Sequence, residues 1–127
     1  MLEHEELTGR IIGAAIRVHT ELGPGFIESI YEEVLALELQ AAGIPFERQM
    51  VIRVLYRGQQ VGEHRLDLLV DKTVVVELKA VGELENIFFA RTRSYLKALD
   101  LKHSLLLNFA AMPLTIKRVH RELSHSQ

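Results

Sequence analysis

The sequence predicts a single α/β domain over residues 1–127, with its elements in the order α-α-β-β-β-α-β-β. Two segments with helical periodicity open the chain, and three strand-like segments with short turn signals between them follow. A further helix then separates the third strand from the fourth. A chain of 127 residues with 48% apolar residues is of a size that builds one hydrophobic core.

The first two segments repeat apolar residues at helical spacing. The first runs from about residue 5 to residue 22, where Gly23-Pro24-Gly25 interrupts it. A second helix is expected from about residue 26 to residue 42. Gly43 suits the position just after that helix, and Pro45 prevents the helix from resuming.

The middle of the chain has the composition of strands. We expect strands over residues 51–56, 61–70 and 73–79, joined by turns at residues 57–59 and 71–72, which predicts an antiparallel meander. A helix over residues 84–99 leads to a strand over residues 104–109, and a strand–helix–strand connection favours parallel pairing. A short strand over residues 115–119 ends the pattern. The predicted sheet is therefore mixed.

Composition excludes several classes of protein. The chain has no cysteine, so it forms no disulfide, no cysteine-ligated zinc site and no cysteine nucleophile. It has no apolar run long enough for a membrane span and no secretory signal pattern, and we expect a cytoplasmic protein. Neither a zinc-type histidine pair nor a phosphate-binding loop or dinucleotide fingerprint is present.

Charge is distributed unevenly along the chain. The net charge is −2, but residues 1–40 carry −6, residues 41–85 carry −1 and residues 86–127 carry +5. The last third includes Lys117, Arg118 and Arg121. This basic third could face phosphates, or it could simply form solvated helix and strand faces, and the sequence leaves both open.

The residues with the strongest chemical signal are Asp67 and the triplet Glu77-Leu78-Lys79. Strand alternation places Glu77 and Lys79 on one face of the third strand. A hairpin centred on residues 71–72 brings Asp67 within one register step of Glu77. Two carboxylates and the Leu78 carbonyl could then hold Mg²⁺ or Mn²⁺, with Lys79 beside them. A salt bridge between Lys79 and either acid is the alternative.

Strict alternation also places Asp67 on the same face as Arg65 and Leu69. A second group of polar residues lies at the start of the second helix, in the pattern Gly25-x-x-Glu28-x-x-Tyr31. Glu28 borders an apolar stripe there, where a carboxylate needs a partner. The partner could be the helix N-terminus, or a metal ion and its waters.

Six short motifs occur in order along the chain, and together they resemble the GxxExxY protein family, which is assigned to the PD-(D/E)XK nuclease superfamily. The resemblance extends from about Leu7 to Arg121. The motifs are Gly25-x-x-Glu28-x-x-Tyr31, Gly62-Glu63-x-x-x-Asp67, Val76-Glu77-Leu78-Lys79-Ala80, Ser94-Tyr95-Leu96-Lys97, Leu107-Asn108-Phe109 and Ile116-Lys117-Arg118.

This resemblance implies a restriction-endonuclease-like αβββαβ core, a mixed sheet flanked by helices, with an extra N-terminal helix and a short C-terminal strand. It also implies a divalent-metal site for phosphodiester hydrolysis. Asp67, Glu77 and Lys79 match the motif residues, and Glu28 resembles a helix glutamate that many members add to the metal site. Tyr31 would position Glu28 or touch the substrate.

One position departs from the family pattern. Four residues before Tyr95 the family often has glutamine, and this chain has Arg91. An arginine there could bind phosphate together with Tyr95, or it could pair with Glu77 and compete with a metal ion.

Two functions are consistent with the sequence. The first is a Mg²⁺- or Mn²⁺-dependent nuclease, with DNA favoured as substrate. The alternative is a catalytically inactive module of the same fold that binds nucleic acid or a protein partner. No membrane partner is expected, and a homodimer would enlarge the small binding surface.

Overall fold

The computed structural model describes residues 2–121, and the side chains from residue 4 onward. Helices α1 (Leu2–Leu22) and α2 (Glu28–Ala41) come first, and strands β1 (Phe46–Tyr56), β2 (Gln59–Val70) and β3 (Val74–Lys79) follow. Helix α3 (Asn86–Leu99) precedes strands β4 (His103–Asn108) and β5 (Thr115–His120). The predicted order of elements is confirmed.

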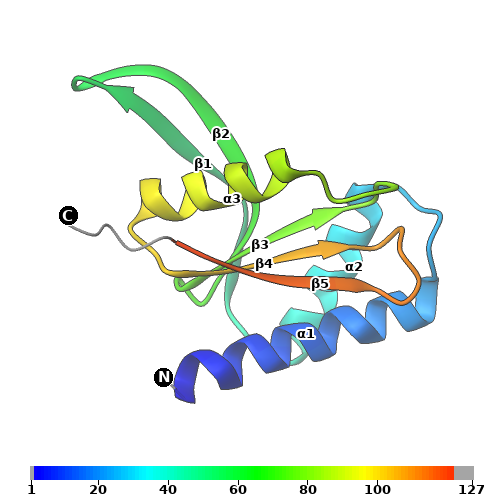
Figure 1. The fold of residues 1–127 in the computed structure, drawn as a ribbon. Helices are drawn as coiled ribbons and strands as arrows, with labels where there is room; N and C mark the ends of the chain where they lie inside the picture. Colours follow the sequence, from blue (N-terminus) through cyan, green and yellow to red (C-terminus); the bar gives the residue numbers. More distant parts are fainter. Residues whose placement is uncertain (1, 122–127) are drawn as a thin grey trace.

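The five strands form one mixed sheet in the order β1-β2-β3-β4-β5. The β1/β2, β2/β3 and β4/β5 pairs are antiparallel, and the β3/β4 pair is parallel, as the helix between them predicts. Helices α1 and α2 cover one face of the sheet and α3 covers the other (Figure 1). This mixed sheet between helices confirms the expected restriction-endonuclease-like architecture.

Each face of the sheet has its own apolar cluster. The larger cluster joins the sheet to α1 and α2, and it includes Val74 and Val76 of β3. The smaller cluster lies under α3 and includes Val75, Tyr95 and Leu96. Consecutive valines therefore face opposite layers, because both faces of a central strand are buried.

Local backbone signals act as the sequence predicts. Asp71 and Lys72 both have positive φ, and the Thr73 N–H donates to the Val70 carbonyl at 3.0 Å, which closes a β-turn with these two residues at its centre. At the end of α2, Gly43 has φ +73° and its N–H donates to the Gln40 carbonyl. A residue in this left-handed conformation is a frequent helix C-terminus.

Strand β1 is longer than expected and begins at Phe46. Together with β2 it forms a hairpin that projects past α3, away from the rest of the sheet (Figure 1). Residues 47–49 are all polar, so this first part of β1 lacks the alternation of apolar and polar residues that predicts a strand.

Candidate active site

Asp67 and Glu77 meet where the hydrogen bonding between β2 and β3 changes. The backbone register pairs Val70 with Val74 and Leu68 with Val76, and its next step would place Asp67 opposite Glu77. There, hydrogen bonds to side chains replace the backbone hydrogen bonds between the two strands. The Asp67 N–H donates to Glu77 Oε2 and the Leu78 N–H donates to Asp67 Oδ2, each at 2.8 Å. The structure confirms that the two acids converge.

These reciprocal bonds define the fork between β2 and β3, formed by Asp67, Glu77 and Leu78. Asp67 lies three residues before the end of β2. Within a strand the N–H and C=O of one residue lie on the same edge. Since the Leu78 N–H points toward Asp67, the Leu78 carbonyl also faces the fork.

Side chains of β2 do not alternate regularly between the two faces of the sheet beside the fork. Gln49, opposite Asp67 in the β1/β2 register, has φ +54°. Leu66 and Leu69 both pack in the cluster under α3, although they are three residues apart. The prediction that Arg65 shares a face with Leu69 is therefore wrong, because β2 reverses its faces at Asp67.

The Glu77 carboxyl is buried and the neighbouring Asp67 side chain is half-buried, and neither forms an ion pair within the residues that the structure describes. Burial raises the pKa of Glu77 to about 8, and the charge of Asp67 adds to the increase. Burial likewise raises the pKa of Asp67 to about 6, although the Leu78 N–H opposes this. Burial and a nearby like charge both disfavour a carboxylate. Such a pair, with a carbonyl at the same fork, is a set of hard oxygen donors that fits Mg²⁺ or Mn²⁺.

Lys79 lies near these acids without forming an ion pair. Its positive charge lowers the pKa of both Asp67 and Glu77, but no salt bridge to Lys79 occurs within 4.0 Å among the residues that the structure describes. Its Nζ lies 4.7 Å from the centroid of the Phe88 ring on α3. The salt bridge considered from the sequence is therefore not formed.

Glu28 reaches the fork region from the start of α2. Its Oε2 accepts a hydrogen bond from the Ala80 N–H at 3.2 Å, one residue beyond Lys79. Its negative charge contributes to the raised pKa of both Asp67 and Glu77. Within residues 4–121, however, no three His, Asp or Glu side chains come close enough to form a ready metal-binding group.

Two residues beside the fork, Glu32 and Gln49, were not predicted from the sequence. Glu32 is buried on α2, and its carboxylate accepts from Arg48 Nε at 3.0 Å and from Gln49 Nε2 at 2.8 Å. Gln49 Nε2 also lies 3.5 Å from Asp67 Oδ1. The spacing of Glu28 and Glu32, four residues apart on one helix face, was the signal that could have identified Glu32.

Asn108, which belongs to a quoted motif, holds the segment that follows β3. Its Oδ1 accepts from the N–H groups of Val81 and Ala110, and its Nδ2 donates to the Val81 carbonyl at 2.9 Å. The side chain thereby fixes the backbone that leaves the fork.

The position of Tyr31 is incompatible with one of its two expected roles. Its side chain is fully buried and stacks on Phe109, with ring centroids 4.5 Å apart. Its hydroxyl donates to the Gly23 carbonyl at 2.6 Å and accepts from the Phe26 N–H at 3.1 Å. The expectation that Tyr31 touches substrate is corrected, because no surface of the ring is left for a ligand. It anchors the turn before Glu28.

Tyr95 and Arg91 lie on α3 as expected. Tyr95 is buried, and burial raises its pKa to about 12, with the charge of Glu77 as the next cause. Arg91 is exposed, and its positive charge opposes the increase in the pKa of Tyr95. Arg91 forms no ion pair with Glu77 in the described chain, so it does not occupy the fork.

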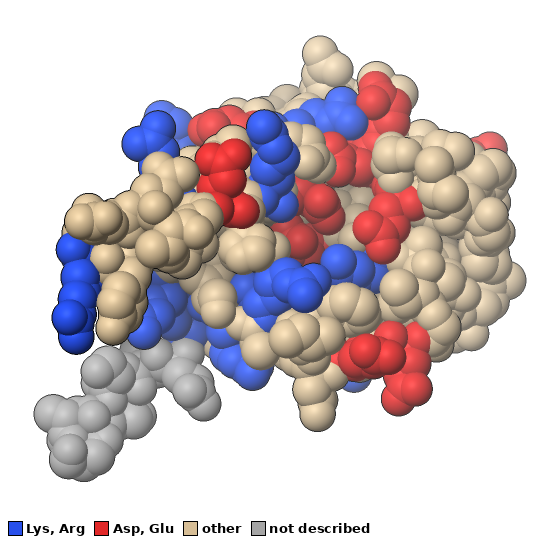
Figure 2. All heavy atoms as spheres, turned by 90° about the horizontal axis from the view of Figure 1, so that it is seen from above, with Lys and Arg blue, Asp and Glu red and all other residues tan. Residues whose placement is uncertain are grey.

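The surface above α3 combines both signs of charge. Figure 2 shows Asp and Glu side chains gathered toward the middle of this face, with Lys and Arg side chains on either side of them. Acidic groups between basic ones suit a site that holds a cation centrally and an anionic chain around it.

Comparison with known proteins identifies the family. A family model described as the PD-(D/E)XK nuclease superfamily matches residues 5–119. The chain belongs to this superfamily, whose nucleases typically use divalent metal ions.

A solved structure titled "Crystal structure of SSO0001" is similar with a TM-score of 0.59 and 16% sequence identity, over 76% of this chain and 50% of that one. At this identity the likeness concerns the fold alone, and the chain spans about half of that structure's length. No curated protein matches the chain. None of the helices in residues 2–121 is both long and apolar enough to span a membrane.

Proposed function

We propose that this protein is a GxxExxY-type nuclease that hydrolyses phosphodiester bonds, with DNA as substrate and Mg²⁺ or Mn²⁺ as cofactor. The observation that carries the proposal is the fork, where buried Glu77 and half-buried Asp67 lie together and neither has an ion-pair partner among the described residues. Their raised pKa values are the mark of a site prepared for a positive charge.

The fork supplies the groups that would hold the ion. They are the carboxylates of Asp67 and Glu77 and the carbonyl of Leu78, with Glu28 close by through its bond to the Ala80 N–H. A bound divalent ion supplies Lewis acidity toward a phosphate and lowers the pKa of water.

Lys79 and Arg91 supply positive charge for the substrate. Lys79 follows Glu77 by two residues on the same strand face, and it has no ion pair in the described residues to be broken first. In this proposal it orients the attacking water and stabilises charge on the attacked phosphate. Arg91, exposed on α3, holds a neighbouring phosphate. Tyr95, beneath Arg91, supports that helix face.

The test is a cleavage assay with variants at the fork. We would incubate wild type and Glu77→Ala with single-stranded, duplex and branched DNA and with RNA, each with Mg²⁺ or Mn²⁺. The proposal predicts metal-dependent cleavage of DNA by wild type alone. Cleavage that persists in EDTA or in Glu77→Ala would contradict it.

Lys79→Met separates chemistry from folding. Methionine keeps the apolar contact with Phe88 and removes the charge, so we expect the Mn²⁺-induced increase in melting temperature to remain and cleavage to be lost. Lys97→Met, an exposed position on α3, is the matched control and should cleave normally. Full cleavage by Lys79→Met would make Lys79 a packing residue.

One observation favours the alternative, a non-catalytic module that binds nucleic acid or a protein partner. The described side chains do not assemble a group of three metal-ligating residues. If the protein is such a module, labelled DNA or RNA should bind without being cleaved under every metal condition. Calorimetric titration with Mn²⁺ distinguishes the two, because a site used in catalysis binds the ion in wild type and not in Glu77→Ala.

We also propose a homodimer, joined through the β1–β2 hairpin. Leu55, Tyr56 and Val61 near the hairpin tip are between 62% and 65% exposed, which is unusual for neighbouring apolar side chains. Light scattering of wild type and of Leu55→Ser with Val61→Ser tests this. A monomer in both at high concentration would refute the dimer without affecting the nuclease proposal.

A further inference from the structure

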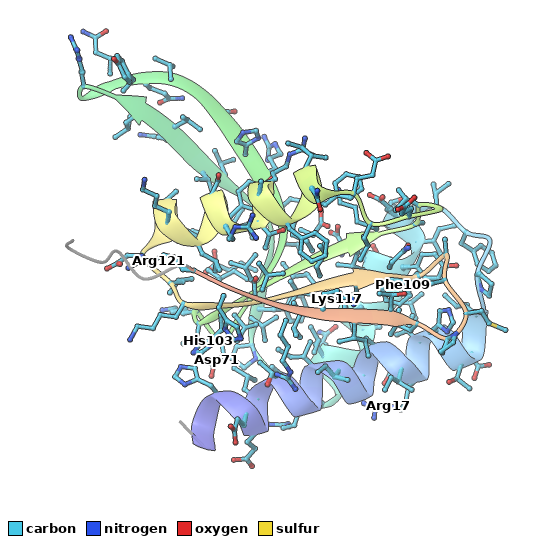
Figure 3. The ribbon with its side chains drawn as sticks, in the orientation of Figure 1. Arg17, Asp71, His103, Phe109, Lys117 and Arg121 are labelled. Atoms are coloured by element: carbon cyan, nitrogen blue, oxygen red, sulfur yellow. The ribbon has the colours of Figure 1, made fainter. Side chains whose placement is uncertain are left out.

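An open polar cavity, half of whose lining residues are exposed, lies where β4 begins, away from the fork. It has a volume of about 870 Å³ and is lined by the first helix and the last two strands. His103 opens β4 and pairs with Val74, whereas Asn108 at the other end of β4 pairs with Lys79. The fork residue Glu77 lies three residues beyond Val74 on β3, which separates the two sites by about 10 Å along the strand. Figure 3 shows His103 near the N-terminal end of α1, with Phe109 at the far end of the sheet.

Three imidazole rings cluster in this cavity. The ring of His103 lies 4.2 Å from that of His4 on α1 and 5.5 Å from that of His120 on β5, between centroids. The three side chains come from three different elements, so the tertiary fold brings them together. The sequence shows no histidine pair at metal-ligand spacing because these residues are far apart along the chain.

Two cationic side chains accompany the histidines. Arg118 lines the cavity, and its Nη1 donates to Thr8 Oγ1 at 2.9 Å, which holds the guanidinium against α1 and leaves its other N–H groups unpaired by described residues. Lys102 adds a second positive charge, and Glu5 is the one acid among the described residues that line the cavity. The lining thus carries +1 with neutral histidines and +4 with all three protonated.

We propose that this cavity binds the phosphate groups of a nucleotide-sized anion. A guanidinium held in place by Thr8 presents several donors to phosphate oxygens, and imidazolium and ammonium groups add charge-assisted bonds. The cavity volume lies within the range of small-ligand sites. The same chemistry suits a free nucleotide and a terminal phosphate of a nucleic acid, and the assay below distinguishes them.

The histidines make this binding dependent on pH. Burial lowers the pKa of His103, and the positive charges of His4, His120 and Lys102 lower it further. Arg118 adds positive charge to the same lining, and among the described lining residues Glu5 carries the opposing charge. An anion bound among these groups favours the protonated rings, so affinity increases as the pH falls through the range of histidine titration.

The first experiment titrates pyrophosphate into the full chain in EDTA, at about pH 6 and about pH 8, by calorimetry. We expect affinity roughly tenfold higher at the lower pH, since histidine is the side chain that titrates there. His103→Gln with His120→Gln should remove most of this difference. Lys117→Gln is the matched control, because Lys117 adjoins Arg118 on the strand but does not line the cavity.

Lys102→Gln changes an exposed side chain, and it serves as the second variant should the double histidine variant fail to fold. It should weaken pyrophosphate binding several-fold at both pH values. Absence of pyrophosphate binding at about pH 6, or equal binding by wild type and Lys102→Gln, would overturn the proposal.

The source of the phosphate is distinguished by comparing adenosine triphosphate with a short oligonucleotide carrying or lacking a 5′-phosphate. Binding of the nucleotide alone assigns a free-nucleotide site, and selective binding of the phosphorylated oligonucleotide assigns a terminal-phosphate site. Repetition with Glu77→Ala separates the cavity from the fork, since loss of cleavage there should leave pyrophosphate binding unchanged.

Discussion

Replacement of Glu77 by glutamine tests whether the fork is a site that lacks its cation. Burial raises the pKa of Glu77 to about 8 from its ordinary value of 4.5. Between these values the folded protein keeps a proton that the unfolded chain has released. The contribution of Glu77 to the free energy of unfolding therefore falls as the pH rises from about 4.5 to about 8.

The magnitude follows from the same two values. At pH 7 the pH exceeds the pKa of Glu77 in the unfolded chain by about 2.5 units. Each unit lowers the free energy of unfolding by about 1.4 kcal/mol, so the wild type loses about 3 kcal/mol of stability. Glutamine removes the titration, and its carbonyl oxygen still accepts from the Asp67 N–H. Glu77→Gln should thus unfold with a free energy about 3 kcal/mol higher than wild type at pH 7, in EDTA.

Urea unfolding of both proteins at steps between about pH 4.5 and pH 8 measures this difference. The advantage of Glu77→Gln should disappear near pH 4.5 and reach its maximum near pH 8. Glu63→Gln, an exposed position on the same hairpin, is the control and should follow wild type. A Glu77→Gln protein that is less stable than wild type at pH 7 would show that a partner stabilises the carboxylate, and the reasoning would fail.

Three further substitutions test the surroundings of the fork. Tyr31→Phe removes two hydrogen bonds of a buried hydroxyl and should lower the unfolding free energy by about 1–3 kcal/mol without changing ligand affinity; an unchanged urea midpoint would contradict this. Asn108→Ala leaves the Val81 N–H and carbonyl without partners, so stability should fall by about 2 kcal/mol, and hydrogen exchange at Val81 should accelerate. Arg91→Gln should unfold within about 0.5 kcal/mol of wild type but bind duplex DNA with a salt dependence about one unit shallower in log–log slope; an equal slope would remove Arg91 from the phosphate contacts.

Much of this architecture could be predicted from local signals. The turn at Asp71 and Lys72 determines the β2/β3 register, and that register brings Asp67 to Glu77. Periodicity identified the helices because one face of each packs on the sheet. The parallel pairing of β3 with β4 followed from the helix between them.

What could not be predicted depends on contacts between distant segments. The positive φ of Gln49 has no local sequence signal, yet it accompanies the reversal of faces beside Asp67. Glu32 contacts residues of β1 that lie 16 and 17 positions away, so helical spacing alone did not reveal its partners. The burial of Tyr31 against Phe109 likewise requires the last strands to be in place.

The projecting hairpin divides the molecule into parts of unequal local stability. Ile52 and Leu66 anchor its base in the cluster under α3, but beyond Arg53 no hairpin side chain is buried until Leu66. A two-stranded ribbon without a second layer is marginally stable by itself. Its amides should therefore exchange through local opening, long before those of β3 and β4 exchange through global unfolding. The arm can open locally while the core that holds Asp67 and Glu77 stays folded.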